Sequence, residues 1–160
     1  MTHTAGQHSY TCTVSWTGNR GTGTSGYRDY DRTHETTGPD GKPSIAGSSD
    51  PVFRGDTSRW NPEELLVASL ASCHMLVFLH RAAVSGVVVT DYSDAATGVM
   101  QEDGEDGGRF VEVTLRPTVT VKDAGMAQKC DDLHTQAHAG CYIASSVNFP
   151  VQHQATTLLG

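Results

Sequence analysis

The sequence predicts an α+β fold in which antiparallel sheets pack around one long helix, and two observations carry this prediction. First, residues 61–86 read NPEELLVASLASCHMLVFLHRAAVSG, with no glycine or proline between the first turn and Gly86. Second, the segments on both sides alternate polar and apolar residues in short runs that Gly- and Asp-rich turns separate, as strands do. We therefore expect a single domain over residues 1–160.

Capping residues mark both ends of the long helix. Asn61 suits the N-cap, Pro62 suits the first helical position, and Glu63 and Glu64 place negative charge in the first turn. Gly86 suits the left-handed residue that ends a helix. Apolar residues lie all round the wheel, so we expect a buried central helix. Polar residues interrupt the apolar run, which argues against a membrane span. They are Ser69, Ser72, His74, His80 and Arg81.

The other elements follow from alternation and turn residues. We expect a strand at 8–16, a mostly polar strand at 25–35, an irregular segment at 45–60, a strand at 87–100, a hairpin turn at 101–108, a strand at 109–121, a helix at 122–140, and a short helical turn with a last strand at 141–159. Pro117 would place its strand at a sheet edge or a bulge, because proline donates no ladder hydrogen bond.

Charge and composition disfavour several classes of function. The net charge is −7 and the pI is near 5.5, so neither nucleic acid nor an anionic membrane is an expected partner. The first residues show no signal peptide and no apolar run reaches membrane length, which favours a cytoplasmic protein. The sequence contains no P-loop, no GxGxxG and no GxSxG, and we expect no bound cofactor.

The four cysteines, at positions 12, 73, 130 and 141, show no CxxC spacing and are more typical of free or redox-active thiols than of a disulfide framework. Cys73 lies in the long helix, where a small apolar core residue is the plain interpretation. Cys141 follows Gly140 at the start of a short helix, whose N-terminus would lower the thiol pKa; packing in the core is the alternative. We expect Cys12 and Cys130 to be core residues.

A metal site is a further hypothesis. His134, His138 and Cys141 follow at four- and three-residue steps, and Cys73 or His74 would serve as a fourth ligand. The spacing is not a strong zinc pattern, and the histidines fit an ordinary helix surface equally well. Our preferred interpretation assigns no metal.

Two segments resemble the cysteine motifs of the OsmC/Ohr family of osmotically inducible and organic hydroperoxide resistance proteins. They are NPEELLVASLASCH, with Gly86 after the helix, and AHAGCYIASSVNFPV. Many members carry Cys-Pro in the second motif, where this chain has Cys141 and Tyr142. The stretch SSDPVFRGD, followed by WNPEELLVASLASCHM, is more similar to the OsmC-like subgroup than to the organic hydroperoxide resistance proteins proper.

The resemblance implies an intertwined homodimer whose long helices lie between sheets, and a thiol-dependent peroxidase. The substrates would be organic hydroperoxides, with hydrogen peroxide as a further candidate, and the reductant a dithiol of lipoyl or another type. Cys73 matches the peroxidatic cysteine, Cys141 the resolving cysteine and Glu63 the acidic residue of the site. For the family's arginine, Arg54 is the first candidate and Arg20 the second.

Two residue-level expectations accompany this assignment. Met75, Leu76 and Phe78 would form apolar walls near Cys73 that suit an organic tail. Glu63 lies ten residues before Cys73, about 15 Å along a helix, so we expect a second antiparallel copy to supply Glu63 in trans. A non-catalytic stress module with packed cysteines, or a small-ligand or metal binder, remains the alternative.

Overall fold

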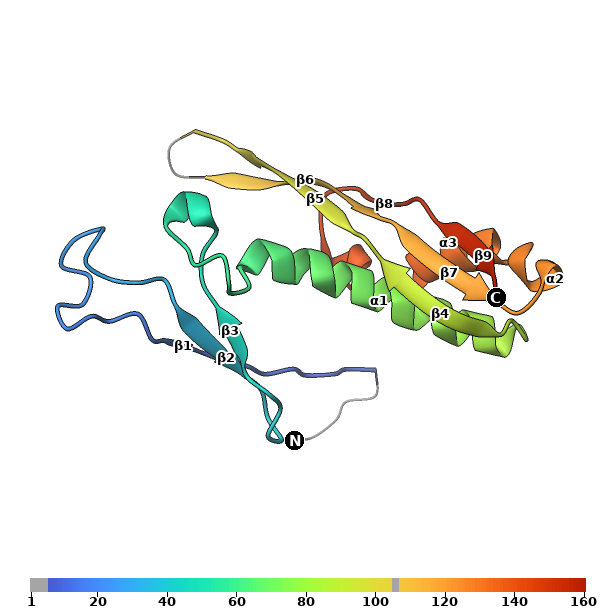
Figure 1. The fold of residues 1–160 in the computed structure, drawn as a ribbon, viewed down its shortest axis with the longest axis horizontal. Coiled ribbons are helices and arrows are strands. Elements are labelled where there is room, and N and C mark those ends of the chain that lie inside the picture. The colour runs from blue at the N-terminus through green and yellow to red at the C-terminus, as the bar shows by residue number, and fades with distance from the viewer. Residues whose placement is uncertain (1–5, 105–106) are drawn as a thin grey trace. The chain divides into compact units, whose positions relative to one another are not determined.

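The computed structural model describes residues 6–104 and 107–160, and the chain divides into two compact units, Met1–Leu65 and Leu66–Gly160. The first unit carries one small sheet, and the second carries two sheets and the shorter helices (Figure 1). The long helix begins in the last residues of the first unit and continues through the start of the second.

The first unit is built on three short antiparallel strands in the order β1-β2-β3. They are β1 (Thr13–Trp16), β2 (His34–Thr37) and β3 (Ile45–Gly47). A 3₁₀ turn, η1 (Pro51–Phe53), follows. Among residues 6–65, no hydrophobic side chain is buried.

The predicted polar strand at 25–35 is wrong over most of its length. Residues 21–29 form turns and bends, Tyr30 makes an isolated antiparallel bridge with Asn19, and continuous strand pairing begins at His34. Arg20 and Arg32 donate to backbone carbonyls within this segment, which gives its polar backbone groups partners outside a ladder. The segment expected to be irregular contributes β3, whose Ala46 carbonyl accepts from the Trp60 amide at 3.1 Å.

Helix α1 (Pro62–Val84) has the ends that the sequence predicts. The Asn61 side chain accepts from the Glu64 amide at 2.7 Å, and the Glu64 carboxylate accepts from the Asn61 amide at 3.1 Å, which is a reciprocal capping box. At the other end Gly86 has φ +70°, and Val87 donates to the Ala82 carbonyl at 2.9 Å. This is the Schellman ending that glycine favours.

The predicted burial of α1 on every face is wrong within one chain. Its fully buried side chains form a single stripe at four-residue steps, namely Leu70, His74, Phe78 and Ala82. Leu76 and Val84, on other faces, are 63% and 66% exposed. By length and apolar content α1 would suffice to cross a membrane, but core helices of folded domains satisfy the same criterion.

Six strands of the second unit form two three-stranded sheets, ordered β4-β7-β9 and β5-β6-β8. Their bounds are β4 (Val89–Asp94), β5 (Thr97–Glu102), β6 (Gly108–Leu115), β7 (Pro117–Val121), β8 (Val151–His153) and β9 (Thr156–Leu159). The pairs β4–β7 and β5–β6 are antiparallel, whereas β8 and β9 pair in parallel with β6 and β7. The sheets are therefore mixed.

Two predicted strands each divide into two. The strand expected at 87–100 breaks between Asp94 and Thr97, and the one expected at 109–121 breaks at Arg116. The edge position predicted from Pro117 is wrong because β7 is the central strand of its sheet. Pro117 is the first residue of β7, where a missing donor is tolerated. The β5–β6 connection confirms the hairpin, although 105–106 lie outside the described residues.

The predicted helix at 122–140 is interrupted. A four-residue turn of helix, α2 (Ala124–Ala127), precedes α3 (Cys130–Gly140), and η2 (Ala144–Ser146) follows. One core cluster joins the C-terminal half of α1 to β7 and α3 through Phe78, Ala82, Val119, Val121, Leu133 and Ala137. A second joins Leu70 to Val113 and Leu115 of β6. These contacts fix α1 and α3 side by side in the second unit.

Candidate active site

The structure places the Cys73 and Cys141 side chains together, one from α1 and one from the C-cap of α3. Both are free thiols; Cys73 is partly exposed, whereas Cys141 is 1% exposed. Burial, followed by a hydrogen bond with Cys73, raises the pKa of the Cys141 thiol to about 11. The geometry therefore pairs an accessible sulfur with a buried thiol that holds its proton.

The expected low pKa of Cys141 is wrong, and the local backbone explains why. Cys141 ends α3 in an extended conformation, and the helix that follows is a three-residue 3₁₀ turn, too short for a substantial dipole. The Ala144 amide donates to the Cys141 sulfur at 3.4 Å, which favours the thiolate. The Ile143 amide acts in the same direction, but loss of water around the buried sulfur outweighs both.

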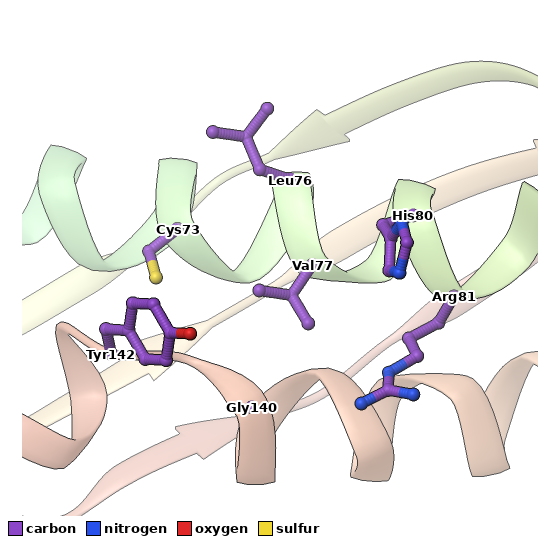
Figure 2. A pocket seen from close by; sticks show the side chains of 7 residues that line it. All are labelled: Cys73, Leu76, Val77, His80, Arg81, Gly140 and Tyr142. Carbon is purple, nitrogen blue, oxygen red and sulfur yellow. The ribbon is translucent and has the colours of Figure 1, made fainter. Parts of the chain in front are cut away.

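Cys73 opens onto a pocket of about 510 Å³ between α1 and the end of α3 (Figure 2). Its lining residues are Cys73, Leu76, Val77, His80, Arg81, Gly140 and Tyr142. A Cβ on Gly140 would lie 3.2 Å from a Val77 methyl carbon, so glycine allows the two helices to approach closely here. The volume matches that of pockets that enclose small organic ligands.

The expected apolar walls are only partly correct. Leu76 lines the pocket with Cys73, but Phe78 lies in the core and Met75 lines a different hollow beside Tyr92 and Ser93 of β4. The helical period explains the difference, because residues two and five positions after Cys73 point to other faces of α1. Val77, four residues after Cys73, is the wall residue that spacing would have identified.

Arg20 and Arg54 lie in the first unit, and Glu63 lies in the first turn of α1, about 15 Å along the helix axis before Cys73. One Glu63 carboxylate oxygen, Oε2, is buried and accepts no hydrogen bond from any described residue. A buried carboxylate oxygen without a partner is unfavourable. A cation or a hydrogen-bond donor beside Glu63 Oε2 would remove this cost.

The two candidate arginines have different surroundings. Arg20 donates to the carbonyls of Asp29, at 3.2 Å, and Arg28, and forms an ion pair with Asp31 at 3.8 Å. The Arg20 side chain therefore stabilises the turn segment in which it lies. Arg54 forms no ion pair with the described residues. Its φ of +66° is unusual for a residue with a side chain, and such strain is common at functional positions.

A buried histidine pair joins α1 to α3 and was not predicted as a unit. His74 Nε2 and His134 Nδ1 are 3.0 Å apart, and the two ring planes are parallel within 1°. Phe78 stacks on His134 with the centroids 4.0 Å apart. Both rings are fully buried, which lowers the pKa of each to about 4. His74 lies four residues after Leu70 and four before Phe78, on the buried face of α1. This periodicity is the sequence signal that could have predicted its burial.

The metal hypothesis finds no site in residues 6–104 and 107–160. No group of three or more His, Cys, Asp or Glu side chains there is arranged to hold a metal ion. His134 is bonded to His74, and Cys141 faces Cys73 instead of the histidines. Of the remaining cysteines, Cys130 is buried as expected, but Cys12 is exposed and its predicted core position is wrong.

Comparison with known proteins identifies relatives of this chain. A family model described as OsmC-like protein matches residues 55–156. This match includes both cysteines and the histidine pair but begins after Arg54. No curated protein matches the chain.

Solved structures share the fold over nearly the whole chain. An OsmC-like protein of unknown function from Vibrio cholerae is 30% identical, with a TM-score of 0.81 over 93% of this chain and 99% of that one. An organic hydroperoxide resistance protein from Elizabethkingia anophelis is 13% identical, with a TM-score of 0.70 over 98% and 100% of the two chains. An organic hydroperoxide resistance protein OsmC from Legionella pneumophila is 20% identical, with a TM-score of 0.65 over 94% of this chain and 97% of that one.

Proposed function

The chain belongs to the OsmC-like protein family, and from this premise we propose that it is a thiol-dependent peroxidase that reduces organic hydroperoxides. The family includes organic hydroperoxide resistance proteins, so a stress-related peroxidase role has family-level support. The observation that carries the proposal for this chain is the contact between Cys73 and Cys141 at an apolar pocket.

The proposed reaction uses the two sulfurs in order. The Cys73 thiolate attacks the outer oxygen of the hydroperoxide, the O–O bond breaks, and the alkoxide leaves and takes a proton to become an alcohol. Cys73 is then a sulfenic acid. The Cys141 sulfur attacks it, a disulfide forms, and the hydroxyl departs with the Cys141 proton as water. A dithiol reductant, of lipoyl or another type, exchanges with the disulfide and regenerates both thiols.

The burial of the two cysteines supports this division of roles. Cys73 is the sulfur that borders the pocket, so a peroxide reaches it first. Cys141 is buried and protonated, which protects it from direct oxidation and keeps a thiol ready beside Cys73. Cys141 therefore resolves the sulfenic acid before a second peroxide arrives.

Arg54 is the proposed cation of the site, with Glu63 as its partner. A guanidinium stabilises a thiolate that apolar surroundings disfavour, and a carboxylate holds the guanidinium in place. The unpartnered oxygen of Glu63 and the unpaired side chain of Arg54 support this assignment over Arg20. In this proposal hydrogen peroxide is a secondary substrate, because the walls around Cys73 are apolar.

We also propose that the working form is an intertwined homodimer in the cytoplasm. The exposed apolar faces of α1 and the absence of buried hydrophobic side chains among residues 6–65 support it, because a second chain would cover both. Glu63 precedes Cys73 by about 15 Å along α1, so an antiparallel partner helix would carry Glu63, and with it Arg54, towards Cys73 in trans. A cytoplasmic setting keeps the thiols reduced between turnovers.

Thiol counting with a small excess of cumene hydroperoxide tests the proposed function. The folded, reduced protein is expected to lose two thiols per chain rapidly, those of Cys73 and Cys141, and to recover them when a dithiol is added. Heat-inactivated protein at equal thiol concentration serves as the control for nonspecific oxidation. Thiols that react with peroxide only after unfolding would contradict the proposal and favour a module whose cysteines are merely packed.

Arg54→Ala is expected to move the pH profile of Cys73 alkylation by iodoacetamide to higher pH. Loss of the cation beside a poorly hydrated sulfur reduces the thiolate fraction at a given pH. Arg20→Ala is the matched control, since it removes the same charge from the same unit and its contacts stay within its own turn. A profile that moves with Arg20→Ala and not with Arg54→Ala would transfer the role to Arg20.

A further inference from the structure

The hydrogen bond between His74 and His134 joins the two segments that carry the cysteines. His74 directly follows Cys73 in α1, and His134 precedes Cys141 by seven residues, roughly two turns of α3. Both His134 and Cys141 therefore lie on the side of α3 that faces α1. Apart from the contact of the two thiols, the described residues show no other hydrogen bond between the side chains of α1 and this segment.

The packing between His134 and Cys141 provides little to fix the position of α3 along α1. Ala137 and Gly140, which lie between them on α3, carry at most one side-chain carbon. Gly140 lies against Val77 of α1, where an added Cβ would be 3.2 Å from a methyl carbon. Small residues allow the helices to approach closely, but they present no large side chain that would interlock and resist a shift.

The histidine pair is unfavourable as a packing element alone. Both rings are fully buried, and His74 Nδ1 and His134 Nε2 have no hydrogen-bond partner among the described residues. Such nitrogens lower stability, and apolar side chains would fill the same space without this penalty. Specificity explains the pair better than stability does, because its hydrogen bond forms in only one register of the two helices.

Disulfide formation requires a defined register. The Cα atoms of a disulfide-bonded pair lie roughly 4.4–6.8 Å apart. A displacement of α3 by one helical turn, about 5.4 Å, would take most pairs out of this range. Such a displacement would separate the imidazoles of His74 and His134 together with the sulfurs of Cys73 and Cys141, so the two contacts depend on the same helix position.

We infer that His74 and His134 are positioning residues for the resolving step, because their hydrogen bond holds α3 on α1 in the register that brings Cys141 against Cys73. Neither ring lines the pocket at Cys73, so the pair takes no part in O–O cleavage. The inference rests on the proposed peroxidase function for the step that the pair assists, but the positioning of the two thiols is measurable without peroxide.

Two substitutions of similar shape separate the hydrogen bond from the packing. His134→Asn places an amide near the position of Nδ1 and keeps a partner for His74, whereas His134→Leu removes it. Proteins with the exposed thiol removed by Cys12→Ser are equilibrated with glutathione buffers, and the equilibrium constant for forming the Cys73–Cys141 disulfide is measured. His134→Leu is expected to lower this constant roughly five- to tenfold, as for one lost hydrogen bond, and His134→Asn to stay within about twofold of the wild type.

Val119→Ala is the control for stability, since Val119 is buried in the same core cluster but belongs to β7. It is expected to lower the free energy of unfolding and to leave the disulfide equilibrium unchanged. The double variant His74→Leu, His134→Leu leaves no unpaired ring, and its constant is expected to fall as in His134→Leu even if the single variant does not fold. A wild-type constant in the double variant, an equal fall in His134→Asn, or an equal fall in Val119→Ala would overturn the positioning role.

Trapping of the sulfenic acid tests the link to the resolving step. Each protein is treated with one equivalent of cumene hydroperoxide in the presence of dimedone, which captures the Cys73 sulfenic acid before it is resolved. The Cys73 thiol should be lost at the same rate in all proteins, and the captured fraction should rise severalfold in His134→Leu but not in His134→Asn. Equal captured fractions in these two variants would refute the role in resolution. If no protein reduces the hydroperoxide, the peroxidase assignment fails, and the glutathione equilibrium alone decides whether the pair positions the thiols.

Discussion

Cys73→Ser is expected to abolish steady reduction of hydroperoxides, with a loss on the order of a thousandfold or more because the nucleophile is gone. Cys141→Ser is expected to behave differently, since Cys73 can still react once with peroxide. The sulfenic acid then has no neighbouring thiol, turnover stalls, and further peroxide drives Cys73 to the sulfinic acid. This asymmetry follows from the pocket, which Cys73 lines and Cys141 does not.

Mass spectrometry of the two variants after peroxide treatment provides the measurement. Cys141→Ser should gain one oxygen and then a second at Cys73, and Cys73→Ser should gain neither at Cys141, which is buried and protonated. Cys130→Ser is a useful control because Cys130 is buried in another cluster, away from the pocket. Steady turnover by Cys73→Ser would reverse the assignment of roles.

Mixed dimers extend the same experiment to the proposed trans arrangement. Cys73→Ser chains and Glu63→Ala chains are unfolded and refolded together. If Glu63 acts across the dimer, both lesions fall in one site of the mixed dimer and the other site is intact, so activity returns. A mixture that contains mixed dimers and stays inactive would place Glu63 in the same chain as its Cys73.

Acid is expected to destabilise the folded protein strongly between about pH 6.5 and 4 through His74 and His134. Burial holds the pKa of each ring at about 4 in the folded state, whereas an unfolded histidine titrates near pH 6.5. The unfolded chain therefore binds more protons in this window. The stability that these rings contribute is fully present above about pH 6.5 and is lost as the pH falls towards 4.

The size of the effect follows from the same shift. Acidification from pH 6.5 to pH 4 removes on the order of 3 kcal/mol of folding free energy for each ring. This loss is large against the usual stability of a small domain. His138 and His153 lie next to the pair, and their positive charges lower the pKa of His74 further. The negative charge of Asp131 acts in the opposite direction and favours a higher pKa for His153, although burial, the larger cause, lowers it.

Urea unfolding at a series of pH values measures this dependence. The double variant His74→Leu, His134→Leu removes both titrating rings and their unpartnered nitrogens, and apolar replacements of a buried polar pair are often tolerated. Its free energy of unfolding should depend much less on pH over the window. An equal slope in both proteins would show that other groups, such as carboxylates, cause the acid sensitivity.

The parts of the fold that local signals encode could be predicted from the sequence. Asn61, Pro62 and Gly86 define α1 because capping depends on residues within one turn of the helix end. Pro117 misled the strand assignment because its tolerance depends on its position in the ladder, a tertiary property. The parallel pairing of β8 and β9 also depends on long-range contacts that no local pattern records.

The candidate site follows the same division. The motif resemblance selected Cys73 and Cys141, and the structure brings them together. The pKa of Cys141 could not be predicted, because burial depends on the packing of α1 against α3. The pairing of His74 with His134, 60 residues apart, required the fold in the same way. Leu76 was predicted as a wall residue and Val77 was missed, although helical spacing would have identified it, whereas the place of Gly140 opposite Val77 required the fold.

The separation of the two cysteines along the chain has a thermodynamic consequence for the proposed peroxidase cycle. A Cys73–Cys141 disulfide closes a loop of roughly 70 residues, and the loss of chain entropy in the unfolded ensemble corresponds to about 4 kcal/mol of added stability. That loop contains β4 to β7 and both shorter helices of the second unit. The oxidised, spent form is therefore the more robust species, and an excess of peroxide over reductant would accumulate protein that resists unfolding until a dithiol reopens the loop.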